Sequence, residues 1–360
     1  MHITALVAGI AVVLLVLWEA FETLVLPRRV SRRLRFTRGF YRVLWGTWTR
    51  IGPHRSGPRR EVYLSVFAPL SLLMLLGAWV IGVVVGFALI QWGLQTPIST
   101  TGVASLSTQL YLSATTFVTL GLGDYTPMSS AGRFIVALEA ASGFAFLALT
   151  ISYLPVLYQS FSRREVRISK LDQWAGSPPT AVEMLRRAAS YGELGAVTDL
   201  LADWERWAAE LLESHLSYPV LAYFRSQHEH ESWLSALTSI LDVTSLVLAG
   251  VDGVSTWQAR RTFAISRHAV VDLAQVLHMP PHAPATNRLD DADLARASAI
   301  LQEGGVTVRP DLAERLAPLR AKYEPYVYVL AGRVEMELPT FLPLADAVDD
   351  WERTAWNEPE

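Results

Sequence analysis

The chain has no cysteine among its 360 residues, which excludes disulfides, thiolate metal sites and cysteine nucleophiles. Lysine is missing from the first 165 residues, where 14 arginines accompany only six acidic residues. The rest of the chain holds 17 basic and 28 acidic residues, so the net charge of −3 is the sum of a basic N-terminal part and an acidic C-terminal part. The arginines of the N-terminal part lie between long apolar runs, so we expect no nucleic-acid partner.

Charge is also absent from residues 62–94, a run of 33 residues. Residues 3–26 and 133–158 are two further apolar segments, the last with Glu139 inside it. A helix that spans a bilayer needs about 20 apolar residues, so the sequence predicts an all-α membrane protein with three spans. Residues 3–26 do not fit a cleaved signal peptide, because no basic residue precedes the apolar core and no small-residue cleavage pattern follows it.

The arginines predict the orientation of the chain. Eleven of them lie between the first two spans, at positions 28, 29, 32, 33, 35, 38, 42, 50, 55, 59 and 60. The positive-inside rule places this loop in the cytoplasm, with the N-terminus and the 95–132 connection outside. Basic residues at 163–170 follow the third span on the same side. We therefore expect a multi-pass plasma-membrane protein with a cytoplasmic C-terminus.

The basic loop mixes arginines with aromatic residues at 34–48. This mixture favours an amphipathic helix on the inner lipid surface, attracted to anionic lipid, over a solvated linker. Glu19 and Glu22 lie near the cytoplasmic end of the first span, and we expect them to pair with Arg28 or Arg29. The first span has no regularly spaced arginines, which argues against a voltage sensor.

Between the second and third spans, a helix-compatible run at 106–118 leads into TLGLGD at 119–124. Non-helical backbone at membrane depth is tolerated only when it is buried in protein or lines a water-filled path. Glycines allow dihedral angles that let successive carbonyl groups face one side. A row of such carbonyls can replace the water shell of a cation. The pattern predicts a short helix that enters the membrane and a bare strand that returns.

TLGLGD resembles the TVGYGD signature of potassium channels, and the resemblance extends over about 62–160. Gly132-Arg133 is similar to the start of the inner helix in that family. Ser152 to Pro155 is similar to the inner-helix end of large-conductance calcium-activated potassium channels. The resemblance implies an outer helix, a pore helix, a selectivity filter and an inner helix.

The filter residues carry over one by one: Thr119, Leu120, Gly121, Leu122, Gly123 and Asp124. The resemblance implies that K⁺ is held by backbone carbonyls of the first four and by the threonine hydroxyl, with Asp124 at the outer mouth. Leu122 replaces the usual tyrosine and loses its phenol hydrogen bond, as in the second filter of some two-pore-domain channels. One chain supplies one strand of carbonyls, so a homotetramer is expected.

Three kinds of functional residue are expected outside the filter. Glu139 is an intramembrane carboxyl, which we expect to support the filter, with cavity-facing placement and hydrogen bonding to Thr115 or Thr116 as alternatives. Gly143 occupies the hinge position of the resembled family. Four residues are expected at the inner cavity and gate, or else in helix packing: Phe144, Leu147, Ile151 and Pro155.

Residues 161–360 predict a helical cytoplasmic region, with apolar residues at helical spacing in 181–191, 201–216, 232–251 and 261–278. We find no nucleotide-binding glycine-rich turn, nucleophile–base pair or phosphate loop, so we expect neither enzymatic activity nor an organic cofactor. His228 and His230 fit a surface loop better than a metal site. An unknown ligand or protein partner would act through 161–170.

The predicted organisation is an N-terminal transmembrane helix, a basic loop, a pore domain and a cytoplasmic regulatory region, at 1–27, 28–60, 61–160 and 161–360. The leading hypothesis is a tetrameric K⁺-selective channel gated by its cytoplasmic region. Two alternatives stay open: a weakly selective cation channel, which Leu122 would explain, and a non-conducting membrane sensor or scaffold.

Overall fold

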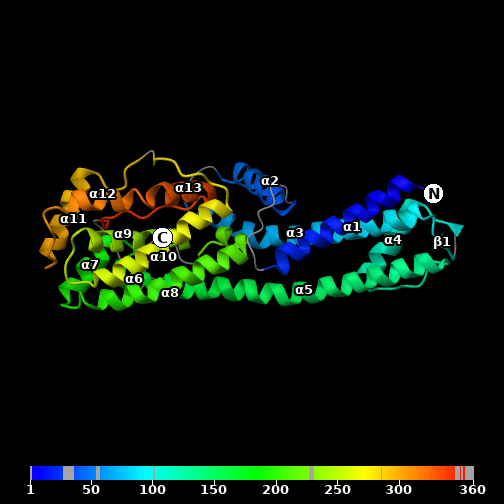
Figure 1. Ribbon diagram of the computed structural model, residues 1–360, viewed down its shortest axis with the longest axis horizontal. Helices are drawn as coiled ribbons and strands as arrows, with labels where there is room; N and C mark the ends of the chain where they lie inside the picture. Colours follow the sequence, from blue (N-terminus) through cyan, green and yellow to red (C-terminus); the bar gives the residue numbers. More distant parts are fainter. Residues whose placement is uncertain are drawn as a thin grey trace, which may run out of the picture. The chain divides into compact units, whose positions relative to one another are not determined.

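Figure 1 shows a computed structural model that describes residues 2–26, 36–53, 57–99, 102–226, 231–284, 286–344, 349 and 352. The chain divides into two compact units, Met1–Tyr158 and Gln159–Glu360. Over the described residues both units are built from helices, with one short β-hairpin in the first. The expected all-α fold class is therefore confirmed.

The first unit holds five helices in the described ranges, the last of which continues into the second unit. They are α1 (Ile3–Leu24), α2 (Phe36–Ile51), α3 (Pro58–Gly93), α4 (Leu106–Phe117) and α5 (Ser130–Ile168), with strands β1 (Pro97–Ile98) and β2 (Gly102–Val103) between α3 and α4. Three of these helices, α1, α3 and α5, are long and apolar enough to cross a membrane. The chain is thus a multi-pass membrane protein with three candidate spans.

Helix α1 packs along α3 through glycines (Figure 1). A Cβ atom on Gly9 would lie 2.6 Å from the carbonyl oxygen of Gly86, and one on Gly86 would lie 2.6 Å from a methyl carbon of Val13. Small residues let membrane helices approach closely, which gains van der Waals contact where lipid offers no hydrophobic drive. Helix α1 therefore packs closely against α3.

Helix α2 is held at its start by α1 and along its length by α3. The Glu19 carboxylate accepts hydrogen bonds from the backbone N–H of Phe36 at 3.1 Å and from the Thr37 hydroxyl at 3.0 Å. A carboxylate there satisfies free N–H groups and complements the helix dipole. Farther along, the rings of Trp48 and Tyr63 stack at 4.7 Å.

The carboxylates of α1 have partners among the described residues that the sequence did not indicate. Glu19 caps α2, and Glu22 accepts a hydrogen bond from the indole N–H of Trp18 at 2.7 Å. Arg28 and Arg29, the partners expected from the sequence, lie outside the described residues. Placing a carboxylate against a helix N-terminus 17 residues away depends on the fold of the chain between them, which the pattern of charges does not encode.

The second unit consists of helices separated by short loops in its described part. They are the end of α5, then α6 (Leu171–Ala175), α7 (Ala181–Ser190), α8 (Ala196–Ser217), the 3-10 helix η1 (Pro219–Tyr223), α9 (Trp233–Ala249), α10 (Thr256–Val276), α11 (Asp291–Glu303), α12 (Leu312–Arg320) and α13 (Glu324–Val334). Helix α9 is apolar and almost wholly buried, so it forms the centre of this unit. The four helices predicted within 161–360 correspond to α7, α8, α9 and α10.

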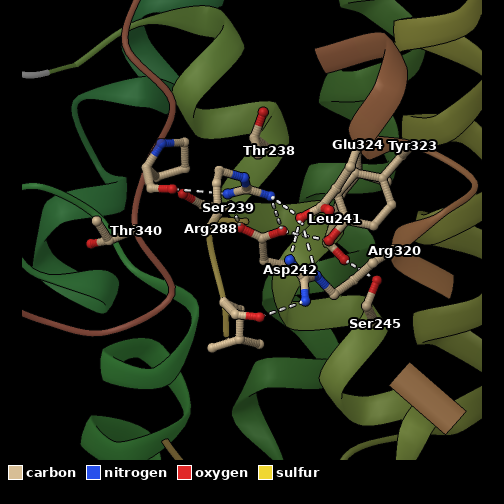
Figure 2. A network of polar contacts seen from close by, with 12 residues as sticks. Thr238, Ser239, Leu241, Asp242, Ser245, Arg288, Arg320, Tyr323, Glu324 and Thr340 are labelled. Carbon is tan, nitrogen blue, oxygen red and sulfur yellow. Dashed lines mark hydrogen bonds and ion pairs between the residues drawn. The ribbon is translucent and has the colours of Figure 1, made fainter. Parts of the chain in front are cut away.

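A network of buried charges joins α9 to the later segments (Figure 2). The fully buried Asp242 of α9 accepts two hydrogen bonds from the Arg288 guanidinium, both at 2.9 Å, and one from the Tyr323 hydroxyl at 2.5 Å. Glu324 contacts Arg288 at 3.2 Å and Arg320 at 3.0 Å. Removing one partner of such a network leaves an uncompensated buried charge, at a cost of about 3–5 kcal/mol.

The end of α5 is embedded in the second unit. The buried guanidinium of Arg164 donates hydrogen bonds to the carbonyls of Leu221 and Phe224, both at 2.9 Å. The indole N–H of Trp207 donates to the Arg164 carbonyl at 3.2 Å. Trp204 and Trp233 are also buried in this unit, as expected for core residues.

His215 packs beside this arginine. Its Nδ1 lies 2.8 Å from the carbonyl oxygen of Leu211, and its Nε2 lies 3.4 Å from the Arg164 guanidinium. These partners require a neutral ring that donates from Nδ1 and accepts at Nε2. Burial and the nearby Arg164 charge lower the pKa of His215 to about 3.

The second unit should therefore lose stability in acid. Between the folded pKa of about 3 and the unfolded value of 6.5, the unfolded chain binds more protons at this residue. The His215 contribution is complete above pH 6.5 and declines as pH falls, at up to about 1.4 kcal/mol per pH unit. Chemical unfolding of the full chain, followed by tryptophan fluorescence from pH 7 to pH 5, measures it. His215→Gln should flatten the dependence; an equal slope in both proteins would contradict the assignment.

Candidate functional site

The TLGLGD segment begins where α4 ends. The hydroxyl of Ser105 caps the start of α4 by accepting the N–H of Thr108 at 3.3 Å. After Phe117 the helix stops, and the N–H of Leu120 donates to the Thr115 carbonyl at 2.8 Å. The helix end thus tethers the first residues of the loop through its free carbonyl groups.

The backbone at 119–123 alternates in handedness. Thr119, Gly121 and Gly123 have positive φ angles of 57°, 54° and 79°, and the two leucines between them do not. A positive φ is costly for threonine and is allowed for glycine, so the glycines stand where the conformation needs them. Leu120 and Leu122 are each 59% exposed in the single chain. The whole segment therefore presents bare backbone and leucine side chains to its surroundings.

The aspartate of TLGLGD has a neighbour that the sequence reasoning missed. The side chain of Tyr111, on α4, lies close enough to interact electrostatically with the Asp124 carboxylate. The Tyr111 ring also contacts the ring of Tyr125 edge to face, at 5.7 Å between centroids. Tyr111 lies 13 residues before Asp124, and only the return of the chain beside α4 brings the two together.

Glu139 of α5 is completely buried and contacts α4. Its partner is the hydroxyl of Ser113, which also hydrogen-bonds the Val84 carbonyl of α3 at 2.7 Å. The hydroxyl of Thr115 instead turns back to carbonyls of α4. The hydroxyl beside Glu139 is therefore that of Ser113, whereas the sequence suggested Thr115 or Thr116, because Ser113 occupies the α4 face toward α5.

Gly143 lies against the C-terminal end of α4. A Cβ atom at this position would come within 2.0 Å of the Phe117 carbonyl oxygen, so no other residue fits without moving the helices apart. Helix α5 is continuous through Gly143. This close approach is a physical reason for the glycine in addition to the hinge expected from the sequence.

The residues expected at the cavity and gate form one stripe along α5. All four are exposed in the single chain, with Phe144 at 69% and Ile151 at 63%. Spacings of three, four and four residues place Phe144, Leu147, Ile151 and Pro155 on one helix face. An apolar helix face of this length, uncovered within its own chain, is available to another copy or to a cavity.

No cluster of three or more potential metal-ligating side chains occurs within the described ranges. His228 and His230 lie outside them. The oxygen atoms that TLGLGD offers are backbone carbonyls, the Thr119 hydroxyl and the Asp124 carboxylate, which are the kinds of ligand that hard cations prefer.

Comparison with known proteins gives one match. A family model described as Ion channel matches residues 71–159, which cover most of α3, all of α4, the TLGLGD loop and the first part of α5. No curated protein and no solved structure matches the chain. Ion channels are not enzymes, which confirms the expectation of no catalytic activity.

The match covers about a quarter of the chain, and α1 and the second unit lie outside it. Pore domains of ion channels generally assemble into multimers and bind the ions they conduct. Residues 71–159 are an ion channel pore domain, to which the chain adds an N-terminal apolar helix and a helical C-terminal region.

Proposed function

We propose that the protein is a tetrameric potassium-selective channel with its filter at Thr119 to Gly123. The observation that carries the proposal is the alternation of positive and negative φ along these residues. Alternating handedness turns successive carbonyls toward one side, which is what a dehydrated K⁺ requires of a filter. Asp124 would raise the local concentration of cations at the outer mouth.

The proposal of a homotetramer rests on backbone that a single chain leaves uncovered. Non-helical backbone cannot face lipid, yet residues 118–124 are uncovered in the single chain. Four copies around an axis would cover this backbone and surround the ion with carbonyls. The same assembly would place the Phe144 and Ile151 stripe around an inner cavity, where an apolar constriction can close by losing water.

The filter lacks the tyrosine hydroxyl that Leu122 replaces, and two contacts offer support in its place. The Tyr111 side chain lies beside Asp124 at the outer end. Glu139 and Ser113 join α5 to α4 behind the loop. These contacts favour a selective filter over a weakly selective one, the alternative that Leu122 keeps open.

We place the N-terminus outside and the second unit in the cytoplasm, because of the arginine-rich loop. That loop would meet anionic lipid of the plasma membrane. Gating would depend on the cytoplasmic unit, since residues 159–168 of the pore-lining helix α5 belong to that unit. A ligand or partner of the unit would open the pore only by binding one of two states better.

Gly121→Ala should abolish K⁺ flux, since φ at 121 is 54° and a methyl group there costs about 1 kcal/mol or more in each of four chains. The measurement is K⁺ flux into liposomes that contain the purified full chain. The matched control is Gly77→Ala on α3, where an added Cβ meets no atom within 4 Å. Undiminished flux through a folded Gly121→Ala tetramer would contradict the filter assignment.

Tyr111→Phe should weaken selectivity, because it removes only the hydroxyl that lies beside Asp124. The loss of one polar contact corresponds to about a two- to tenfold fall in the K⁺-over-Na⁺ permeability ratio. Reversal potentials in K⁺ and Na⁺ gradients measure this ratio. Tyr191→Phe, at a position 84% exposed in the second unit, serves as the control. A ratio equal to that of the wild type would remove Tyr111 from the filter support.

Arg164→Met should change gating, because the guanidinium ties the end of α5 to the carbonyls of Leu221 and Phe224. Losing these bonds should destabilise the second unit by about 1–3 kcal/mol. Flux per channel should depart from that of the wild type by about threefold or more, a change of at least ~0.6 kcal/mol in the gating equilibrium. Arg163→Met, at the exposed neighbouring position, should leave both unchanged. Normal gating in a destabilised Arg164→Met protein would argue against coupling through this residue.

A further inference from the structure

The segment that leaves TLGLGD runs beside strand β1. The N–H of Ser99 donates to the Thr126 carbonyl at 3.1 Å, and the N–H of Met128 donates to the Pro97 carbonyl at 2.8 Å. Ile98 and Pro127 form an antiparallel bridge between them. The exit of the loop is thus paired to the connection that follows α3.

Two buried glutamines stand behind this pairing. The side-chain amide of Gln91, at the end of α3, donates to the Gly132 carbonyl of α5 at 3.1 Å and accepts the Thr96 hydroxyl at 2.6 Å. The amide of Gln109, on α4, donates to the Thr96 carbonyl at 3.3 Å. Both glutamines are 1% exposed. One hydrogen-bonded chain therefore joins α3, the connection after it, α4 and α5.

Gly132 is fitted to this junction. A Cβ atom there would lie 2.4 Å from the Thr96 methyl carbon and 3.1 Å from Cβ of Pro127. The next residue, Arg133, donates from its Nε to the Pro127 carbonyl at 3.1 Å. The Gly-Arg pair after the loop thus has a local physical role: the glycine admits Thr96 and the arginine holds the exit strand.

The glutamine junction is the outer of two polar connections between the same three helices. The inner one consists of the Val84 carbonyl, Ser113 and Glu139. On α3 and on α5 the two connections are seven residues apart, from Val84 to Gln91 and from Gly132 to Glu139. Seven residues make about two helical turns, so both connections use one face of each helix. The loop from Val118 to Ser129 lies between points fixed by these connections.

We propose that Gln91, Thr96 and Gln109 are positioning residues for ion selection, a role that rests on the proposed channel function. Gln109 lies in the first turn of α4, so the junction holds the start of α4 and the start of α5 at a set separation. The proposed filter runs from the other end of α4 back to this junction. Buried amides cost free energy unless they are hydrogen-bonded, so an apolar side chain would loosen the junction and leave the Gly132 carbonyl without this donor. A looser junction would let the carbonyls adjust to a smaller ion.

The test uses the full chain in liposomes, with reversal potentials in K⁺ and Na⁺ gradients. Thr96→Val keeps the shape and removes the hydroxyl, and Gln91→Leu removes the amide. Each should raise the Na⁺-to-K⁺ permeability ratio by about two- to tenfold. The matched control is Ser71→Ala, a residue of α3 that is 1% exposed and hydrogen-bonds only within its own helix, to Ala68.

A double variant separates a shared role from two independent ones. Gln91→Leu and Gln109→Leu act through the same Thr96, so their effects on the permeability ratio should combine to less than the product of the single effects. A role limited to packing would change thermal stability of the tetramer without changing the ratio. If Gln91→Leu fails to assemble, Thr96→Val still tests the proposal, because valine preserves the shape of the threonine side chain.

Failure of the positioning role can be distinguished from failure of the proposed channel function. A wild-type protein that passes no K⁺, or does not prefer it to Na⁺, overturns the channel proposal itself. A selective wild type whose Thr96→Val and Gln91→Leu variants match Ser71→Ala overturns only the positioning role. Raised Na⁺ permeability in both variants, with Ser71→Ala unchanged, supports it.

Discussion

Backbone that is neither helical nor paired cannot face lipid, and this constraint governs the first unit. The chain carries such backbone at 118–124, between helices of a membrane protein. Each unsatisfied peptide group in hydrocarbon would cost several kcal/mol. The bare segment must therefore be covered by other copies or must line water, and a channel pore does both. The proposals of a symmetric assembly and of a filter both derive from this requirement.

The same requirement explains why the surroundings of the loop are polar in an otherwise apolar unit. The loop has few internal contacts, so its shape has to be set from outside. Tyr111 reaches Asp124, Ser113 reaches Glu139, and Gln91 reaches the Gly132 carbonyl. Each pair joins elements distant in sequence and replaces water that the membrane does not supply. The glycines at 86 and 143 serve the complementary need, because they let α1 and α4 approach their neighbours closely.

Much of this architecture is predictable from the sequence, because spans, loop and filter-like motif depend on local composition. Apolar runs predicted α1 and α3 within about four residues and the start of α5 within three, whereas α5 continues ten residues beyond its predicted end at 158. The Gly-x-Gly pattern indicated positive φ where Gly121 and Gly123 have it. Tyr111, Ser113 and Gln91 were missed, because an aromatic, a hydroxyl and an amide in an apolar run carry no signal of their partner. Similarly, no charge pattern pairs Glu19 with the start of α2. Such contacts arise only after the helices pack.

The positions of these hydrogen bonds along α5 also indicate where a pore would open. The hydrogen bonds described here that join α5 to α3 and α4 reach it at Gly132 and Glu139, in its first three turns. Beyond Gly143 the helix continues as an exposed apolar stripe, and its last residues are fixed within the second unit by Arg164. Between these points the helix is not bare on every side, because Phe146 packs against the first unit and Leu157 is fully buried, whereas Phe144 and Ile151 are uncovered in the single chain. On the proposed channel function, movement of the face with Phe144 and Ile151 would cost fewer contacts than movement of the start of α5. The start of α5 is held by polar contacts at two depths and would resist the same movement.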